Sequence, residues 1–286
     1  MTLQETAPAK INLGLSITGK RADGYHTILS VFQTVGLCDI LRLSSSCPGE
    51  LVCNHPDVPT DQKNLILKAE TLFCEKYGIK ERTGFILKKK IPVGGGLGGG
   101  SADAAAALRG LRSLYGIDAE NETLKEIACA LGSDIPFLVI GGTAVVSGRG
   151  EVIKEVQWPF NFYYVLVAPG FGVSTAWAYS RVSRYGENAD AYGSMTDKLL
   201  NGTLSRDEFF GALNNDFEPA VFDRYSVLDD IKHRLLKLGA CRALMTGSGS
   251  TILGIFDDNE EADMCGRSLS DDGFKTFVVA AHESLS

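Results

Sequence analysis

The chain has 286 residues, 44% of them apolar and 22% charged, a balance typical of a globular protein with one large domain or two ordinary ones. Its 35 acidic and 28 basic residues give a formal net charge of −7, which argues against a protein whose main task is to bind nucleic acid. This charge is compatible with a local pocket for a small anion.

The cysteines and the first residues bear on the cellular compartment. No two cysteines form a C-x-x-C pair and their spacing is irregular, which indicates neither a zinc site nor a disulfide framework. The N-terminus has neither a basic start nor an apolar signal-peptide segment, and no apolar run approaches membrane-spanning length. We therefore expect a cytoplasmic protein, a monomer or weak homodimer, with no membrane or nucleic-acid partner. The thiols expected to be reduced are those of Cys38, Cys47, Cys53, Cys74, Cys129, Cys241 and Cys265.

The first half of the chain mixes strand and helix patterns. An Asp23-Gly24 turn signal separates two β-rich segments, and Gly78 ends a helix whose apolar side chains share one face. Ser101 is predicted as the N-cap of a helix that runs to about Leu114. The predicted elements are strands at residues 10–19, 28–44 and 84–93, helices at 63–78, 101–114 and 121–131, and a hairpin at 143–156.

The polar and aromatic stretch 157–161, which contains Pro159, is the best candidate for a domain boundary. It gives predicted domains 1–158 and 159–286. Strands and helices are mixed without a strict βαβ alternation, which favours the α+β class over a doubly wound sheet. The predicted elements beyond the boundary are strands at 162–169, 243–256 and 274–281, and helices at 195–202, 225–239 and 260–268.

Residues 94–101 are the most informative stretch, because six glycines and Leu97 stand directly before Ser101. A flexible turn needs only one or two glycines. The loop also matches G-x-G-x-x-G, but that dinucleotide pattern expects a second apolar strand after the helix, where this chain is polar. A Walker A loop requires Lys before the Ser, and Gly100 stands there instead.

Phosphate binding is the interpretation that remains for this loop. Glycines let backbone N–H groups converge on a polyanion at a helix N-terminus, where the helix dipole also favours negative charge. The Ser101 hydroxyl can add a contact, either to a phosphate oxygen or to a metal ion that the phosphate holds. The lysines at 88–90 are interpreted as a partly solvated strand end, one of which can raise the local positive potential.

The loop and the alanines after it resemble the phosphate loop of the GHMP kinases, a superfamily named after galactokinase, homoserine kinase, mevalonate kinase and phosphomevalonate kinase. Residues 8–13 with 21–26, and residues 131–137, look like the members that act on 4-diphosphocytidyl-2-C-methyl-D-erythritol. Residues 245–250 resemble the superfamily's third, glycine-rich motif. These blocks occur in the family's order from residue 8 to about 255.

The resemblance implies a fold, a reaction and its small molecules. The implied fold has an N-terminal domain like ribosomal protein S5 domain 2 and a C-terminal ferredoxin-like α/β sandwich. The implied reaction uses ATP and Mg²⁺ and phosphorylates the 2-hydroxyl of a substrate that bears a cytidine diphosphate group, in the non-mevalonate isoprenoid pathway. The implied nucleotide-binding residues are Pro92, Gly94, Gly95, Gly96, Leu97, Gly98, Gly99, Gly100, Ser101 and Ala102.

Two positions depart from the family's pattern near the nucleotide. The family's loop often reads Ser-Ser where this chain has Ser101-Ala102, so one hydroxyl is missing. Lys63 stands before Asn64 where an Asp is frequent, and we assign no adenine contact there. Ser101 stays the one expected metal ligand.

The resemblance assigns catalytic roles to Lys10 and Asp134. From the residues alone, Asp134 before Pro136 is equally typical of a helix N-cap, and both roles can coexist. Lys10 between Ala9 and Ile11 either is an exposed strand lysine or points inward. By resemblance Asp134 orients or deprotonates the acceptor hydroxyl, and a neighbouring Lys10 favours the charged carboxylate and stabilises a developing alkoxide.

The resemblance also implies an acceptor pocket. Tyr25 would stack on the cytosine and His26 would hydrogen-bond its edge, although the residues alone suggest an ordinary hairpin end. Tyr179 would be a second stacking ring, although a core aromatic on a helix is nearly as good an interpretation. The other implied substrate contacts, with buried strand polarity or a tight turn as alternatives for some, are Asn12, Thr175, Gly247 and Ser248.

Three other functions fit parts of the pattern. A GHMP kinase for another small alcohol, such as mevalonate or homoserine, lacks the Tyr25-His26 block. A catalytically silent nucleotide-binding regulator has no need of both Lys10 and Asp134. A dehydrogenase ranks last, because the second strand and the acidic residue for a ribose are missing.

Overall fold

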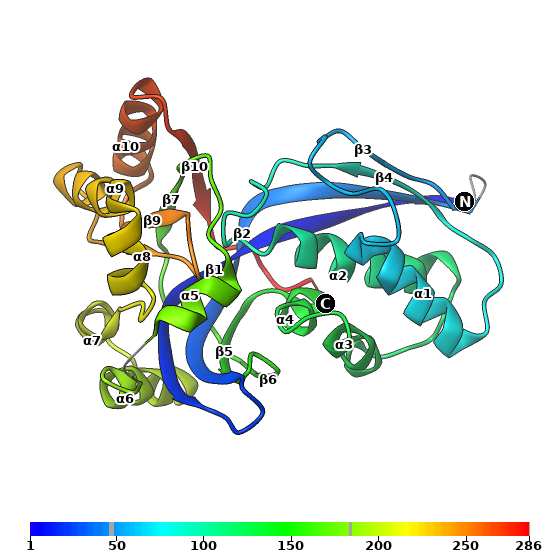
Figure 1. Cartoon of the computed structure of the whole chain (residues 1–286), viewed down its shortest axis with the longest axis horizontal. Helices are drawn as coiled ribbons and strands as arrows, with labels where there is room; N and C mark the ends of the chain where they lie inside the picture. The colour runs from blue at the N-terminus through cyan, green and yellow to red at the C-terminus, as the bar shows by residue number, and fades with distance from the viewer. Residues whose placement is uncertain (46–48, 183–184, 286) are drawn as a thin grey trace.

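The computed structural model describes residues 1–45, 49–182 and 185–285 and contains two β-sheets with helices packed against them (Figure 1). The strands are β1 (Thr2–Lys20), β2 (His26–Ser44), β3 (Leu51–Cys53), β4 (Gly84–Lys88), β5 (Thr143–Gly148), β6 (Val152–Glu155), β7 (Tyr163–Ala168), β8 (Arg242–Met245), β9 (Ile252–Phe256) and β10 (Lys275–Ala280). The larger sheet has the order β3-β4-β2-β5-β6 with β1 paired to β2, and the smaller has the order β10-β7-β9-β8.

The helices segregate with the two sheets. Helix α2 packs against α1, α4 and β1, and its buried alanines allow this close approach because they have no long side chain. Helices α9 and α10 pack on the smaller sheet. The predicted α+β class is confirmed. The helices are α1 (Leu65–Tyr77), α2 (Gly99–Leu114), α3 (Asn121–Cys129), α4 (Ile135–Ile140), α5 (Thr175–Arg181), α6 (Ala189–Leu200), α7 (Arg206–Ala212), α8 (Glu218–Arg224), α9 (Ser226–Lys237) and α10 (Asn259–Asp271).

Strands β1 and β2 form a long antiparallel hairpin that carries several predicted site residues. Residues 7–17 of β1 are buried without interruption, because helices of the first half and residues of the second half cover its two faces. Register shifts lie between Pro8 and Ala9 and between Asn12 and Leu15. Such bulges re-aim side chains near functional sites, and these two flank Lys10.

The two sheets share contacts across the predicted boundary. Residues 157–161 lie between β6 and β7, which belong to different sheets, so the boundary at 158 stays a prediction about domains. Tyr192 of α6 is fully buried against the first hairpin, where its hydroxyl donates to the carbonyl of Leu13 and accepts from the N–H of Val31 at 3.0 Å. The second half therefore completes the core of the first.

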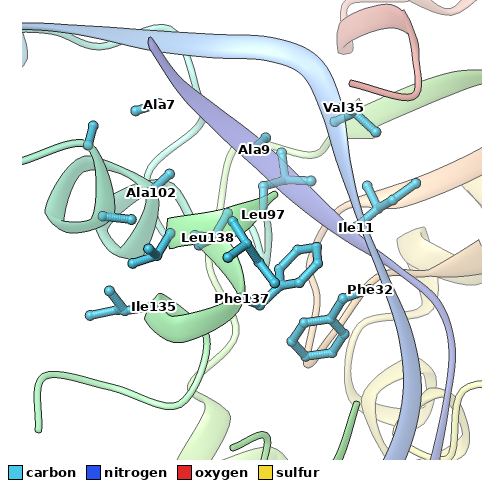
Figure 2. Packing of buried hydrophobic residues seen from close by; sticks show 14 of the residues in the cluster. Ala7, Ala9, Ile11, Phe32, Val35, Leu97, Ala102, Ile135, Phe137 and Leu138 are labelled. Carbon is cyan, nitrogen blue, oxygen red and sulfur yellow. The ribbon is translucent and has the colours of Figure 1, made fainter. Parts of the chain in front are cut away.

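A buried cluster anchors the glycine-rich loop. Leu97, the one apolar residue among its six glycines, is 1% exposed and belongs to the cluster of Ala9, Phe137 and Leu138 (Figure 2). The carbonyl of Leu97 also accepts a hydrogen bond from the N–H of Lys10 at 3.0 Å. The loop is therefore a fixed part of the core and not a free turn.

Two local predictions were wrong. Helix α2 begins at Gly99 with Gly98 as its N-cap, so Ser101 lies inside the first turn and is not the cap. The glycine run starts the helix early because Gly98 adopts a left-handed conformation, φ 68°, and accepts from the N–H of Ala102. The predicted strand 243–256 is two strands, β8 and β9, joined by a turn that contains Gly247 and Gly249.

Three further expectations concern the cysteines, membrane-spanning helices and the end of α1. Six of the seven cysteines are free thiols, as expected, and Cys47 lies outside the described residues. Within the described ranges, no helix combines the length and the apolar character that crossing a membrane requires. The predicted end of α1 at Gly78 is confirmed, since that residue is its left-handed C-cap.

We expect Gly14→Ala to destabilise the protein more than Gly170→Ala. Both glycines have nearly the same positive φ, 88° and 87°, so alanine carries a similar backbone strain of about 1–2 kcal/mol at either position. A Cβ on Gly14 would lie 2.5 Å from the ring of Tyr192, whereas Gly170 has open space. Steric overlap should cost a further ~1–3 kcal/mol in the free energy of unfolding, measured in denaturant. Equal losses would contradict this packing.

Candidate active site

The glycine-rich loop and the start of α2 form one wall of a pocket of about 360 Å³. The N–H groups in the first turn of a helix have no intrahelical partner, so those of Gly99, Gly100 and Ser101 are available to an anion. Residues 57–59 and 63–65 form the facing wall. Of the loop residues predicted to bind nucleotide, Ala102 does not line this pocket, because its side chain is buried in the core.

A buried charge cluster lies behind this loop. Lys89 is almost fully buried and its ammonium donates to Asp39 and, at 2.7 Å, to Asp103 of α2. Burial lowers the pKa of Lys89, but the two carboxylates outweigh this effect and raise it. Burial raises the pKa of Asp103 to about 7, against the opposite effect of Lys89. The interpretation of residues 88–90 as a solvated strand end was therefore wrong for Lys89.

Lys10 and Asp134 meet at the other side of the loop. Their charged groups are 3.3 Å apart, with the Lys10 side chain 6% exposed and that of Asp134 33% exposed. Lys10 also donates to the side-chain oxygen of Asn12 at 2.7 Å, and Asn12 donates to Ser30 at 2.9 Å. Lys10 therefore points inward, and its ammonium is held in one position while Asp134 keeps access to solvent.

The position of Asp134 is compatible with either of its two interpretations, a helix N-cap or a carboxylate that faces the acceptor. The residue stands at the N-cap of α4, as the Asp134-to-Pro136 pattern suggests, but its side chain makes no capping hydrogen bond. The carboxylate is directed to Lys10 instead. The capping role of this side chain is therefore not realised.

A second pocket, of about 690 Å³, opens beside this ion pair. It adjoins the first pocket at the glycine-rich loop, because Gly96 and Gly98 line both. The loop therefore separates two chambers whose contents can meet across it. The predicted catalytic and substrate residues that line the second pocket are Lys10, Asn12, Tyr25, His26, Asp134, Thr175, Tyr179, Gly247 and Ser248.

Aromatic rings gather at one end of the second pocket. His26 stacks on Tyr179 with ring centroids 4.8 Å apart and planes 12° from parallel. Tyr25 is 58% exposed, and the guanidinium of Arg149 lies 5.1 Å from its ring centroid. Burial, and then the charge of Lys20, lower the pKa of His26, so its imidazole is neutral at physiological pH with one donor and one acceptor nitrogen.

Tyr185 is a further ring at this end that the sequence interpretation missed. Its centroid lies 5.6 Å from that of His26, and its hydroxyl is 3.4 Å from Nε2 of the imidazole. The sequence around it, next to a glycine, carries no motif.

The turn between β8 and β9 closes the pocket from the smaller sheet. The hydroxyl of Thr246 accepts from the N–H of Asn12 at 2.8 Å, and the hydroxyls of Thr175 and Ser248 are 2.9 Å apart. A Cβ on Gly96 would lie 2.8 Å from the carbonyl oxygen of Thr246, so any side chain there would separate loop and turn. Gly247 and Ser248 thereby line the same pocket as Lys10 and Asp134.

This fold and its phosphate loop define a GHMP kinase, and two family models agree. The model "GHMP kinases N terminal domain" matches residues 64–142, and "GHMP kinases C terminal" matches residues 199–274. The chain is 42% identical over 262 residues to a 4-diphosphocytidyl-2-C-methyl-D-erythritol kinase of Chlorobium phaeobacteroides, with 91% of each chain covered. The protein belongs to the family of 4-diphosphocytidyl-2-C-methyl-D-erythritol kinases.

Other relatives agree with this membership. A kinase of the same name from Bacillus subtilis is 39% identical over 89% of this chain and 88% of its own. A crystal structure of 4-(cytidine 5'-diphospho)-2C-methyl-D-erythritol kinase matches with a TM-score of 0.80 at 30% identity, covering 98% of this chain and 99% of that one. A homoserine kinase from Cytophaga hutchinsonii, at 20% identity and a TM-score of 0.78, shares the fold.

We expect Lys89→Met to destabilise the protein by about 3–5 kcal/mol at pH 8, because it leaves Asp39 and Asp103 buried together without a counter-charge. Protonation of these carboxylates removes the unpaired charge, so the loss should shrink as the pH falls toward 5. Lys88→Met, at an exposed neighbouring position, is the matched control and should change stability by less than about 0.5 kcal/mol. Denaturant unfolding without nucleotide measures both. A loss that does not depend on pH would contradict the charge explanation.

Proposed function

We propose that this protein transfers the γ-phosphate of ATP to the 2-hydroxyl of 4-diphosphocytidyl-2-C-methyl-D-erythritol, in the non-mevalonate isoprenoid pathway. The observation that carries the proposal is the Lys10–Asp134 pair, at 3.3 Å, in an aromatic-ended pocket that meets the phosphate-loop pocket at Gly96 and Gly98. A phosphoryl donor in one pocket and an alcohol in the other can react only across this loop. The names of the relatives supply the acceptor.

Asp134 is the group that acts on the acceptor hydroxyl in this proposal. The hydroxyl oxygen forms a bond to the γ-phosphorus while the bond from that phosphorus to the β,γ-bridging oxygen breaks, and ADP leaves. The hydroxyl proton passes to the Asp134 carboxylate, which is partly exposed and can release it to water. The buried Lys10 ammonium compensates negative charge on the attacking oxygen and orients the carboxylate.

The phosphate loop supplies the remaining charge compensation. Its backbone N–H groups at the start of α2 bind the triphosphate in this proposal, and residues 57–59 and 63–65, which line the same pocket, enclose the rest of the nucleotide. Mg²⁺ in kinases binds one or two protein groups together with phosphates and water. Within the described ranges no three acidic, histidine or cysteine side chains gather to hold a metal, which fits such a site. The Ser101 hydroxyl is its proposed protein ligand.

The aromatic end of the second pocket is the proposed cytidine site. Tyr25 and Tyr179 offer ring faces for stacking, and the neutral His26 offers a donor and an acceptor to the edge of the base. Thr175, Ser248 and Asn12 offer polar contacts to the acceptor. Because His26 and Tyr179 stack on each other, a bound base must either open this stack or lie on its outer face.

The setting of this activity is part of the proposal. We place the protein in the cytoplasm, as a monomer or weak homodimer that needs neither nucleic acid nor a membrane. The net charge of −7 and the free thiols of the six described cysteines support this setting.

An ADP-release assay with three acceptors tests the proposed function. Diphosphocytidyl-methylerythritol, mevalonate and homoserine are offered in parallel with ATP and Mg²⁺. We expect turnover with the first alone, because the aromatic end of the pocket has no partner in the two smaller alcohols. Turnover with mevalonate or homoserine only would overturn the proposal.

We expect Asp134→Asn to lower kcat by about 10²- to 10⁴-fold while the Kd for ATP stays unchanged, since the amide cannot accept the proton. Asp118→Asn, at an exposed position remote from the pockets, is the control and should retain full activity. Steady-state kinetics and nucleotide titration measure the two quantities. Loss of ATP binding in Asp134→Asn would instead assign this residue a structural role.

A further inference from the structure

The turn between β5 and β6 brings a basic residue to the acceptor pocket. Arg149 stands in this turn and lines the pocket, although β5 and β6 carry none of the predicted site residues. A Cβ on Gly150, the next residue, would lie 3.1 Å from the Cβ of Ser133. The turn therefore rests against the residue that precedes Asp134.

The Arg149 side chain extends from this turn toward the aromatic end of the pocket. Its guanidinium lies 5.1 Å from the centroid of the Tyr25 ring, and its Nε is 4.0 Å from the carboxylate of Glu151. Within the described ranges the guanidinium donates no hydrogen bond to another side chain, and the side chain is 44% exposed. Its N–H groups can therefore turn to an anion that enters the pocket, in competition with the Glu151 carboxylate.

The charges of the pocket leave positive potential at this end. The charged residues that line the pocket are Lys10, Lys20, Asp134 and Arg149. Lys10 is paired with Asp134, and the carboxylate of Glu151, 4.0 Å from Arg149, lies outside the lining, so Lys20 and Arg149 have no carboxylate partner among the residues that line the pocket. A pocket with this balance favours an acceptor that carries negative charge between its two ends.

The proposed acceptor carries such a negative charge between its cytidine and its reacting hydroxyl. A diphosphate links the cytidine to the methylerythritol, so it must lie between the aromatic rings at Tyr25 and the reacting hydroxyl at Asp134. Arg149 spans this interval, with its guanidinium at Tyr25 and its backbone turn at Ser133. Arginine suits this role because its planar group binds phosphate oxygens in pairs and stacks on an aromatic face at the same time.

We infer that Arg149 binds the diphosphate of the acceptor and is a specificity-determining residue for nucleoside diphosphate-linked alcohols. This inference rests on the proposed function for the identity of the acceptor. Stacking on Tyr25 limits the rotamers of the guanidinium, which reduces the entropy lost when phosphate binds. Because Arg149 contacts Tyr25, the base that binds Tyr25 and the diphosphate that binds Arg149 order these two side chains together.

Competition by cytidine and by CDP separates this role from a structural one. We expect Arg149→Gln to raise the inhibition constant of CDP, and the acceptor KM, by about 10- to 100-fold. This range corresponds to the binding free energy that hydrogen bonds between charged partners contribute. The inhibition constant of cytidine and the KM for ATP should change by less than about twofold, because neither ligand contacts the lost charge. Arg149→Lys should recover part of the CDP affinity, since it restores the charge without the paired donors.

Arg267→Gln is the matched control, because Arg267 is an exposed arginine of α10 that lines neither pocket. It should leave CDP inhibition unchanged. Equal weakening of cytidine and CDP in Arg149→Gln would show that Arg149 only supports Tyr25, and would overturn the inference. So would an unchanged CDP constant, or an equal loss in Arg267→Gln. If the wild-type protein fails to phosphorylate the acceptor while CDP binding still depends on Arg149, the proposed function fails and the diphosphate site stands.

Discussion

The order of the glycine-rich loop is the constraint on which the rest of the site depends. Six glycines within residues 94–100 lose more backbone entropy on folding than any other residue type would, so attachments outside the loop must hold it. Leu97 is buried in the core, and its carbonyl accepts from the N–H of Lys10. The carbonyl of Gly95 accepts from the N–H of Thr251 at 3.2 Å. The loop is thereby tied to the core, to β1 and to the smaller sheet at once.

Strand β1 connects the nucleotide side of the site to the acceptor side. The backbone of Lys10 holds the loop while its side chain holds Asp134, and the N–H of Asn12 binds the turn of the smaller sheet through Thr246. A displacement of this strand would move the glycine-rich loop and the Asp134 carboxylate together. Continuous burial of β1 on both faces makes such a displacement costly, because core packing tolerates few voids.

The parts of the site that were predictable are those encoded by local motifs. The glycine run, the Asp134-to-Pro136 pattern and the hairpin before His26 each need only neighbouring residues, and the structure builds the loop, the helix start and the hairpin there. The N-cap of α2 was misplaced because glycines can start a helix without a side-chain cap, which composition does not reveal.

Residues whose roles depend on distant contacts were not predictable in the same way. Lys89 looked like one of three surface lysines, and its partners Asp39 and Asp103 come from other elements. Strand alternation held a partial signal, since Lys89, the residue after β4, continues the buried alternation of Phe85 and Leu87 while Lys88 and Lys90 are exposed. Arg149 and Tyr185 carried no such signal, because only the folded chain brings Arg149 to the pocket and Tyr185 to His26.

The arrangement of charge answers a difficulty that the reaction itself creates. Two polyanionic substrates must approach each other at the loop, and their repulsion opposes the encounter. In the proposed arrangement helix α2 presents its positive end to the nucleotide, Lys10 lies between the two substrates, and Arg149 and Lys20 line the acceptor pocket. Since the chain as a whole carries −7, these positive groups attract anions only locally. Binding energy gained at the cytidine diphosphate, away from the reacting hydroxyl, can therefore offset the repulsion between the two substrates. This explains why the acceptor pocket is larger than the reacting alcohol alone would require.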